Sequence, residues 1–223
     1  MSSSWLARAA DRAPAVEGRR EKAVEISSAI VAAAQRLLVT QASGFTVQEL
    51  VKEAGVGLPT FYRHFRSKDD LMLVVVGDLI AAAAEHYADQ GRAHDDPLDR
   101  LAYYIRATLA TLGDEKVSRF GTAEFTRLRQ LFPDEMVDVA RPVTDLIQAT
   151  IEDAAATGRI TPADPSHDAE LITELVINAY HRRAVSGEAR TPDDVAAHVT
   201  HFVLNGLGAT HAAAKPRSRK GSR

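Results

Sequence analysis

Apolar residues recur at every third or fourth position along most of the chain, which is the spacing of one face of an amphipathic helix. The first clear stretch is marked by Ile26, Ile30, Ala33 and Leu37. Gly44 follows this stretch, where a helix is expected to stop. No segment alternates apolar and polar residues over the length of a strand. The pattern therefore predicts an all-α chain without a sheet.

Two short helices are predicted next, each by the residues at its ends. Thr46 and Glu49 have the spacing of a capping box, in which each side chain bonds the backbone N–H of the other residue. Gly55 ends this first short helix. Gly57 is the expected N-cap of a second one, from about residue 58 to 65. Pro59 falls in its first turn, where a missing N–H costs nothing.

Longer helices are predicted over the rest of the chain. Ser67 is the expected N-cap of the first of them, and Asp69 and Asp70 lie in its first turn against the positive end of the helix dipole. Beyond residue 90, helical spacing is interrupted by Gly and Pro. It predicts helices near 98–112, 115–133, 136–154, 167–186 and 192–208, which makes about nine in all.

The charge is distributed unevenly along a chain whose net charge is only −3. Residues 1–70 carry 10 Lys and Arg against 8 Asp and Glu, whereas residues 71–210 carry 12 against 22. The tail, 211–223, has five basic residues and no acid. A basic front and an acidic body suit a protein that offers only its front to a polyanion, although a chance fluctuation gives the same pattern.

Several function classes find no support in the sequence. The chain has no cysteine, which excludes disulfides and a thiol nucleophile. It lacks the nucleotide-binding, serine hydrolase and metalloprotease motifs, so we expect no enzyme and no cofactor. His198 and His201 lie three apart, but no third ligand accompanies them, so we expect no metal site. No signal peptide is visible, and the apolar run Leu71–Val76 is too short to span a bilayer, which predicts a cytoplasmic protein.

The most informative stretch is TVQELVKEAGVGLPTFYRHFRSKDDL, from Thr46 to Leu71. It combines a capped short helix, a tight turn containing glycine and a second short helix, which is the layout of a helix-turn-helix. In that motif the second helix enters the major groove of DNA while the first crosses the backbone. Phe61 and Phe65 have the spacing of core residues in such a unit.

This stretch resembles the DNA-binding domain of the TetR/AcrR family of regulators. Two positions depart from the family pattern: Val51 replaces a usual alanine, and Gly57 replaces a usual serine or threonine cap. The matching positions are Thr46, Val47, Leu50, Ala54, Gly55, Val56, Pro59, Thr60, Phe61, Tyr62, His64, Phe65, Ser67, Lys68 and Leu71. The resemblance implies a homodimeric repressor that binds a palindromic operator and is released by a small molecule.

The resemblance and the side-chain chemistry together predict a DNA-binding surface. Thr60, Tyr62 and His64 match positions that face DNA in the family, and Lys68 matches one that meets a phosphate. Gln suits adenine and Arg suits guanine, so Gln48 and Arg63 could read base edges. The predicted DNA-binding set is Thr46, Gln48, Pro59, Thr60, Tyr62, Arg63, His64 and Lys68.

The resemblance also implies that the chain beyond the motif forms a ligand pocket, with the last two helices pairing across a dimer. Asn178 and His181 share a helix face inside an apolar segment, so each could contact a ligand or serve as a core or interface group. Arg106, Arg127 and Arg129 could favour an anionic ligand, or form surface salt bridges. The predicted ligand-binding set is Tyr103, Tyr104, Arg106, Phe125, Asn178 and His181.

These predictions divide the chain into four segments: an arm (1–18), a three-helix DNA-binding domain (19–66), a ligand-binding and dimerisation domain (67–210) and a basic tail (211–223). Three alternatives stay open. The chain could be an activator on the same fold, a helical enzyme, or an interaction module that does not bind DNA.

Overall fold

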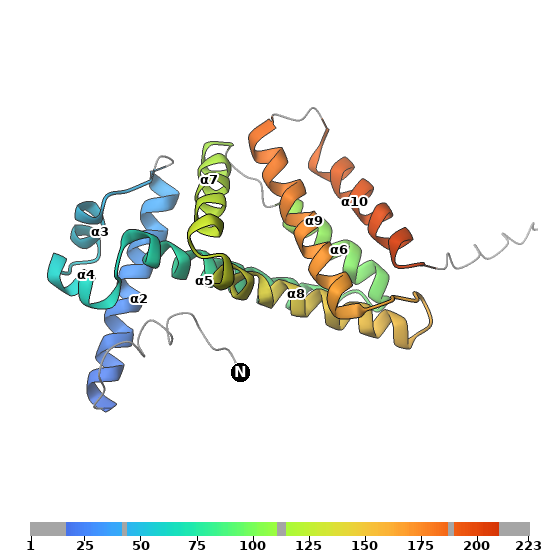
Figure 1. Cartoon of the computed structure of the whole chain (residues 1–223), viewed down its shortest axis with the longest axis horizontal. Helices are drawn as coiled ribbons and strands as arrows, with labels where there is room; N and C mark the ends of the chain where they lie inside the picture. Colours follow the sequence, from blue (N-terminus) through green and yellow to red (C-terminus); the bar gives the residue numbers. More distant parts are fainter. Residues whose placement is uncertain (1–16, 42–43, 111–114, 187–189, 210–223) are drawn as a thin grey trace, which may run out of the picture.

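The computed structural model describes residues 17–41, 44–110, 115–186 and 190–209. Within these residues the chain is all-α, with nine helices and no strand, which confirms the predicted fold class (Figure 1). The arm and the tail lie almost wholly outside the described residues. The helices are α2 (Glu17–Thr40), α3 (Val47–Glu53), α4 (Leu58–His64), α5 (Lys68–Gly91), α6 (Pro97–Ala110), α7 (Glu115–Leu131), α8 (Pro133–Ala156), α9 (Pro165–Ser186) and α10 (Pro192–Gly206).

The N-caps of α3 and α5, and the turn between α3 and α4, form as the sequence predicts. The Thr46 side chain accepts a hydrogen bond from the backbone N–H of Glu49, and the Glu49 carboxylate accepts one from the N–H of Thr46. Gly55 turns the chain between α3 and α4 with a φ of 67°, a left-handed conformation that favours glycine. Ser67 caps α5 by accepting from the N–H of Asp70.

A first hydrophobic core lies among α2, α3, α4 and the first turns of α5. Leu50 and Phe61 are fully buried there, and the Phe61 and Phe65 rings stack with their centroids 5.8 Å apart. The predicted core role of both phenylalanines is therefore confirmed. Leu128 of α7 and Met136 of α8 belong to the same core. The unit formed by α2, α3 and α4 is thus packed directly onto helices from the rest of the chain.

A second hydrophobic core joins α6, α8, α9 and α10, around Leu101, Ile105 and Ile151. In Figure 1, α8 lies along α5, and α10 packs beside α6. The long helix α5 connects the two ends of the molecule. Its residues Leu71–Val75 belong to the first core, and its later turns extend beside α8.

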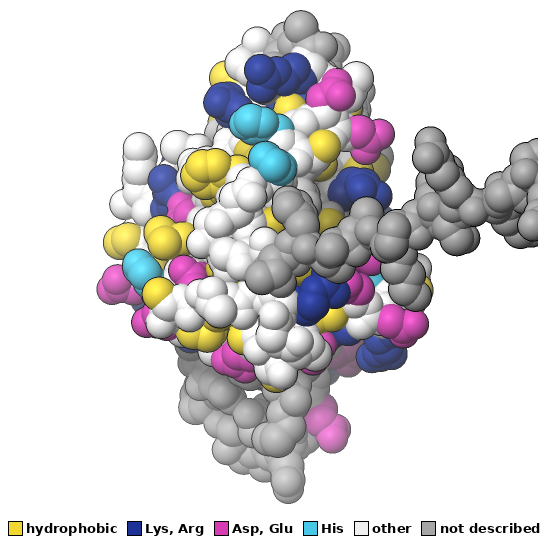
Figure 2. Space-filling model, turned by 90° about the vertical axis from the view of Figure 1, so that its right-hand side faces the viewer, with side chains coloured by type: hydrophobic (Ala, Val, Ile, Leu, Met, Phe, Trp, Pro, Cys, Tyr) yellow, Lys and Arg dark blue, Asp and Glu magenta, His cyan; other side chains and the backbone are white. Residues whose placement is uncertain are grey.

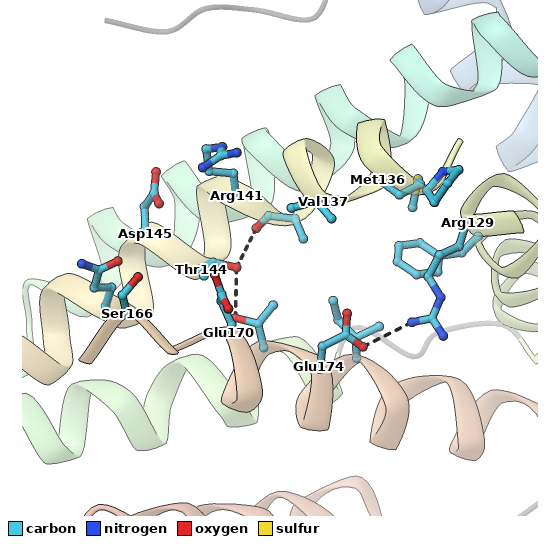
Figure 3. Close-up of a pocket in the computed structure, with 15 residues that line it drawn as sticks. Arg129, Met136, Val137, Arg141, Thr144, Asp145, Ser166, Glu170 and Glu174 are labelled. Atoms are coloured by element: carbon cyan, nitrogen blue, oxygen red, sulfur yellow. Dashed lines mark hydrogen bonds and ion pairs between the residues drawn. The ribbon is translucent and has the colours of Figure 1, made fainter. Parts of the chain in front are cut away.

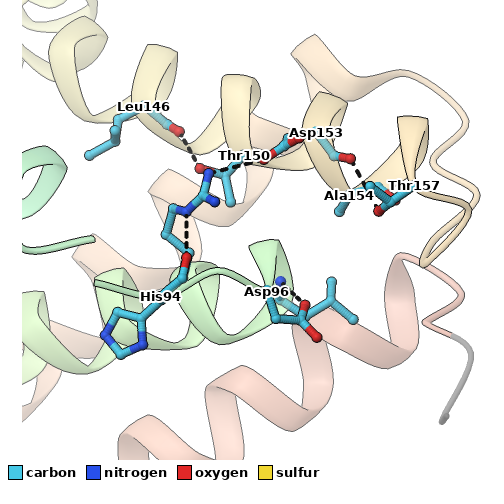
Figure 4. Close-up of polar contacts among 9 residues, drawn as sticks. His94, Asp96, Leu146, Thr150, Asp153, Ala154 and Thr157 are labelled. Atoms are coloured by element: carbon cyan, nitrogen blue, oxygen red, sulfur yellow. Dashed lines mark hydrogen bonds and ion pairs between the residues drawn. The ribbon is translucent and has the colours of Figure 1, made fainter. Parts of the chain in front are cut away.

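Polar contacts fix α6 against α8 at the edge of this second core (Figure 4). Arg100 donates to the Asp153 carboxylate at 3.0 Å and to the carbonyl of His94 at 3.3 Å. Asp96 accepts from the backbone N–H of Leu98 at the start of α6 and pairs with Arg159 beyond the end of α8. These bonds add polar links between α6 and α8 beside the second core.

Two helical segments, Glu21–Thr40 and Lys68–Gly91, are long and apolar enough to cross a membrane by length and composition alone. Both contribute to the first core, with Ile30, Ala33 and Val75 fully buried. Packing inside a protein requires the same apolar character, so core formation accounts for these two segments.

Candidate nucleic-acid interface and effector cavity

The helix α4 divides its side chains between the core and the surface. Phe61 and His64 point inward, whereas Tyr62 and Arg63 are exposed. Tyr62 keeps 54% of its surface exposed while its ring packs edge-on against Phe61, with centroids 5.1 Å apart. The aromatic contact holds the ring in place and leaves its hydroxyl outside.

Five of the eight predicted DNA-binding residues are wholly or partly exposed on α3 and α4. Gln48, Pro59, Tyr62 and Arg63 are exposed, and Thr60 is half-buried. In the part of the chain that the structure describes, the side chains of Gln48 and Arg63 form no hydrogen bond or ion pair. These five residues are called the α3–α4 surface below. It offers amide, hydroxyl and guanidinium groups, which can contact both phosphates and base edges.

Two of the predicted DNA-binding residues have structural partners. The Thr46 hydroxyl is engaged with Glu49, to which it donates at 2.8 Å while accepting from its N–H. The Lys68 ammonium donates to the backbone carbonyl of Phe45 at 2.5 Å and lies 4.8 Å from the centre of the Phe45 ring. Lys68 therefore ties the start of α5 to the segment that precedes α3.

His64 differs from its prediction as a residue that faces DNA. Only 7% of its surface is exposed, and its Nδ1 shares a 2.9 Å hydrogen bond with the buried hydroxyl of Ser27 on α2. Burial, helped by the charge of Arg63, lowers the pKa of His64. The correction has a simple geometric reason: His64 lies three residues after Phe61, so one helical turn brings both onto the inner face.

The helix α7 contacts the segments that flank α3 and α4 at two places. Arg127 pairs with Asp69 in the first turn of α5 and with Glu124 on its own helix, each at 2.6 Å. These hydrogen bonds, Glu124 first, raise the pKa of Arg127. The Phe120 ring covers Gly44, where an added Cβ would lie only 2.9 Å from the ring. Both contacts fix α7 to the elements that flank α3 and α4.

A cavity of about 500 Å³ lies among α5, α6, α7, α8 and α9. Its polar groups are hydroxyls, from Tyr104, Thr108 and Tyr180 among others, and the imidazole of His181. Desolvation, with a smaller effect of Arg129, lowers the pKa of His181 to about 4, so the cavity wall carries no charge near neutral pH. The lining residues are Val76, Leu79, Ile80, Ala83, Tyr87, Tyr104, Ile105, Thr108, Gly121, Phe125, Ala140, Val143, Leu146, Ile147, Thr173, Val176, Ile177, Tyr180 and His181.

Three of the six predicted ligand-binding residues line this cavity: Tyr104, Phe125 and His181. The His181 ring packs against Phe125 with centroids 4.6 Å apart. The contribution of α5 was missed, although Val76, Ile80, Ala83 and Tyr87 follow helical spacing. That spacing identifies a buried face without showing whether the face meets a core or a cavity.

The other three predicted ligand-binding residues lie outside this cavity, so it gives their predicted role no support. Tyr103 stacks on His94, Arg106 is exposed on α6, and the Asn178 amide donates to the carbonyl of Glu174 on the exposed side of α9. Asn178 and His181 lie three residues apart, which is slightly less than one turn of α9. His181 therefore lies on the side that lines the cavity, whereas Asn178 lies on the exposed side. The arginines proposed for an anionic ligand are also absent from the cavity wall.

A groove of about 340 Å³ with charged residues in its wall runs between α8 and α9 next to the cavity (Figure 3). It has four wall residues in common with the cavity: Phe125, Ala140, Thr173 and Ile177. The Thr144 hydroxyl hydrogen-bonds that of Thr173 at 3.2 Å across the groove floor. Five charged residues line it: Arg129, Arg141, Asp145, Glu170 and Glu174.

The comparisons with known proteins agree with this arrangement. Residues 30–75 match the family described as bacterial regulatory proteins, tetR family. The HTH-type transcriptional regulator EthR of Mycolicibacterium smegmatis is 29% identical over 189 residues, which cover 82% of this chain and 86% of EthR.

Similar folds occur among solved structures. RolR in complex with resorcinol superimposes with a TM-score of 0.68 at 18% identity, over 85% of this chain and 90% of RolR. Thermus thermophilus FadR, a TetR-family repressor in complex with lauroyl-CoA, gives the same TM-score and identity, over 85% of this chain and 98% of FadR. Reduced Escherichia coli NemR gives 0.61 at 22% identity, over 84% and 100%.

The matched helix-turn-helix domain and the similarity to EthR identify a DNA-binding transcriptional regulator. Residues 30–75 form a DNA-binding domain of the TetR family of these regulators, and the chain is similar to members of that family over most of its length.

Proposed function

We propose that the chain is a cytoplasmic repressor that binds a palindromic operator as a dimer and is released by a small-molecule effector. The observation that carries this proposal is the position of α7. Through Gly121 and Phe125 it forms part of the cavity wall, and through Phe120 and Arg127 it contacts the elements on either side of α3 and α4. One helix thus joins a binding cavity to the unit formed by α2, α3 and α4, which is called the DNA-facing unit below.

DNA contact is assigned to the α3–α4 surface. The exposed hydroxyl of Tyr62 suits phosphate, which positions the protein, whereas Gln48 and Arg63 can bond base edges, which gives sequence specificity. The N-terminus of α5 adds free N–H groups and the half-exposed Lys68 beside that surface. His64 acts through the core: its bond to Ser27 fixes α4 against α2.

Dimerisation is assigned to α9 and α10. Leu171 and Val185 on α9 each keep 56% of their surface exposed, and Phe202 on α10 keeps 65%. Figure 2, seen from the α10 side, shows hydrophobic and histidine side chains exposed among charged ones. Large exposed apolar side chains on neighbouring helices are typical of an interface. A two-fold dimer would present two α3–α4 surfaces to a palindrome.

Release of DNA follows from the contacts of α5 and α7. Both helices line the cavity, and their contacts at Asp69 and Gly44 border the DNA-facing unit. An effector that fits one arrangement of α5 and α7 better than another will shift the population between them. If the two α4 helices lose the spacing of the half-sites, the operator is released. Coupling of this kind is typically about 1–3 kcal/mol.

The decisive experiment selects sequences from a random duplex DNA pool with the purified chain. Tyr62→Ala and Arg63→Ala remove exposed groups, and Tyr103→Ala is the matched control outside the unit. We expect the chain and the control to enrich a palindrome and both other variants to lose it. Enrichment that survives both variants would overturn the assigned surface, and no enrichment at low salt would overturn the repressor proposal. A reporter fused to the operator separates repression from activation.

A further inference from the structure

The cavity and the groove differ sharply in charge although they touch. No residue of the cavity wall carries a charge near neutral pH, whereas five of the groove residues are Asp, Glu or Arg. An ionic group placed inside the cavity would lose its hydration without gaining a partner, which is costly. The part of an effector that fills the cavity must therefore be uncharged and mainly apolar.

The groove offers an adjoining place for a polar head. Phe125, Ala140, Thr173 and Ile177 line both spaces, so a molecule in the cavity can extend past them without crossing another layer of side chains. Thr144 and Thr173 lie on the floor with their hydroxyls in contact. In Figure 3 the charged side chains stand around this floor, on α8 and α9 and at the end of α7.

The charges of the groove favour some heads over others. Both arginines are already paired with carboxylates: Arg129 with Glu174 at 3.2 Å, and Arg141 with Asp138 at 2.7 Å. Glu170 pairs with His167 at 3.5 Å, and Asp145 forms no close ion pair in the described residues, although both carboxylates are near enough to Arg141 to raise its pKa. The groove thus has three carboxylates against two arginines, and both arginines are already paired, so a cationic head is favoured over an anionic one.

We propose that the cavity and the groove form one site for an amphiphile, with its apolar body in the cavity and an uncharged or cationic head in the groove. The inference rests on the proposed function, because it identifies the effector class of the same regulator. It excludes effectors with a carboxylate or phosphate head. The chain would differ in this respect from the FadR structure that holds lauroyl-CoA.

The test compares three molecules with the same chain: decylamine, 1-decanol and decanoate, titrated calorimetrically at concentrations below micelle formation. Exposed charge pairs typically contribute about 0.2–1 kcal/mol each. The amine should therefore bind at least about tenfold more tightly than the acid. Each carboxylate of the groove attracts the ammonium head and repels the carboxylate head, so both effects add to the difference. The alcohol should lie between them.

Glu170→Gln combined with Glu174→Gln locates the head. This variant should weaken decylamine, strengthen decanoate and leave decanol unchanged. Glu85→Gln combined with Asp89→Asn removes two exposed carboxylates from α5 and should change none of the three. Gly121→Leu, which fills the cavity, should weaken all three alike.

The outcomes separate this proposal from the function beneath it. Equal binding of amine and acid, or no response to the groove variant, would overturn the groove as a head site while leaving the cavity as an effector site. Failure of all three molecules to bind would overturn the proposal that the effector is an amphiphile. In either case, operator selection by the same protein would still decide whether the chain is a DNA-binding repressor.

Discussion

The DNA-facing unit and the cavity region use apolar side chains in opposite ways. In the unit around α3 and α4, Leu50, Phe61 and Phe65 fill a compact core and hold polar groups outward. In the second region, aromatic and aliphatic residues of five helices line a partly open cavity, with polar groups among them. The first arrangement favours a single rigid surface. The second leaves helices that can adjust around a ligand, since close packing does not fix them on that side.

The largest expected effect contrasts the inner and outer faces of the first region, at neighbouring positions of α4. Phe61→Ala removes a fully buried ring from the first core and should cost about 3–5 kcal/mol of unfolding free energy. Tyr62→Ala removes an exposed ring and should cost well under half of that, while abolishing operator binding. Urea denaturation followed by circular dichroism, with gel shift on the selected operator, measures both. Equal destabilisation by the two variants would contradict the assigned inner and outer faces.

The next effect concerns acid and the cavity. The pKa of His181 is lowered to about 4, so the unfolded chain binds a proton below pH 6.5 that the folded chain does not. Stability is therefore complete above pH 6.5 and falls as the pH drops towards 4. After allowance for its partial exposure, His181 should account for no more than about 2 kcal/mol of this loss.

Comparison with His181→Phe isolates that contribution, because the carboxylates titrate in both proteins. Denaturation midpoints between pH 7 and pH 4.5 should fall less steeply in the variant. Buried His64, whose pKa is also lowered, remains in both chains and gives both a residual slope of the same sign. Parallel pH profiles would show that the cavity does not hold a neutral histidine.

The smallest effect lies at the boundary between the two regions. The Arg127–Asp69 pair is about one-third exposed on each side, so a double-mutant cycle with Arg127→Gln and Asp69→Asn should give a coupling energy of about 0.5–1 kcal/mol. The exposed pair Arg92–Asp89 is the control, and its cycle should give less. We also expect Arg127→Gln to weaken the effect of a cavity ligand on operator affinity. A coupling energy of zero would exclude this pair from the proposed coupling between the cavity and operator binding.

The two regions also differ in how far their residues predict them. Thr46, Glu49, Gly55 and Ser67 act on their own neighbours, so their positions alone predicted the caps and the turn. His64 was assigned to the outer face from the family resemblance, although its spacing from Phe61 is that of an inner residue. Its hydrogen-bond partner Ser27, 37 residues away, is not visible in the local sequence.

The cavity depends on contacts between distant parts of the chain. Apolar spacing correctly predicted buried faces, but the cavity exists only where α5, α6, α7, α8 and α9 meet. Residue type alone favoured Tyr103, Arg106 and Asn178, which share their helices with true lining residues. A single position separates Tyr103 from Tyr104 and Arg106 from Ile105, and only packing decides which residue of each pair faces inward.

The central claim is that filling the cavity releases DNA, and Gly121→Leu tests it without any ligand. Gly121 lines the cavity, and an added Cβ meets no atom within 4 Å. Replacing a helical glycine should also stabilise α7 by up to about 1 kcal/mol, so lost binding cannot be ascribed to unfolding. Ala123→Leu, at an exposed position of the same helix, is the control. Titrated against the selected operator, the Gly121 variant should bind at least about tenfold more weakly than the parent chain, which is about 1.4 kcal/mol, while the control binds normally. A Gly121→Leu protein that is folded, has lost decanol binding and still binds the operator with unchanged affinity would contradict the account.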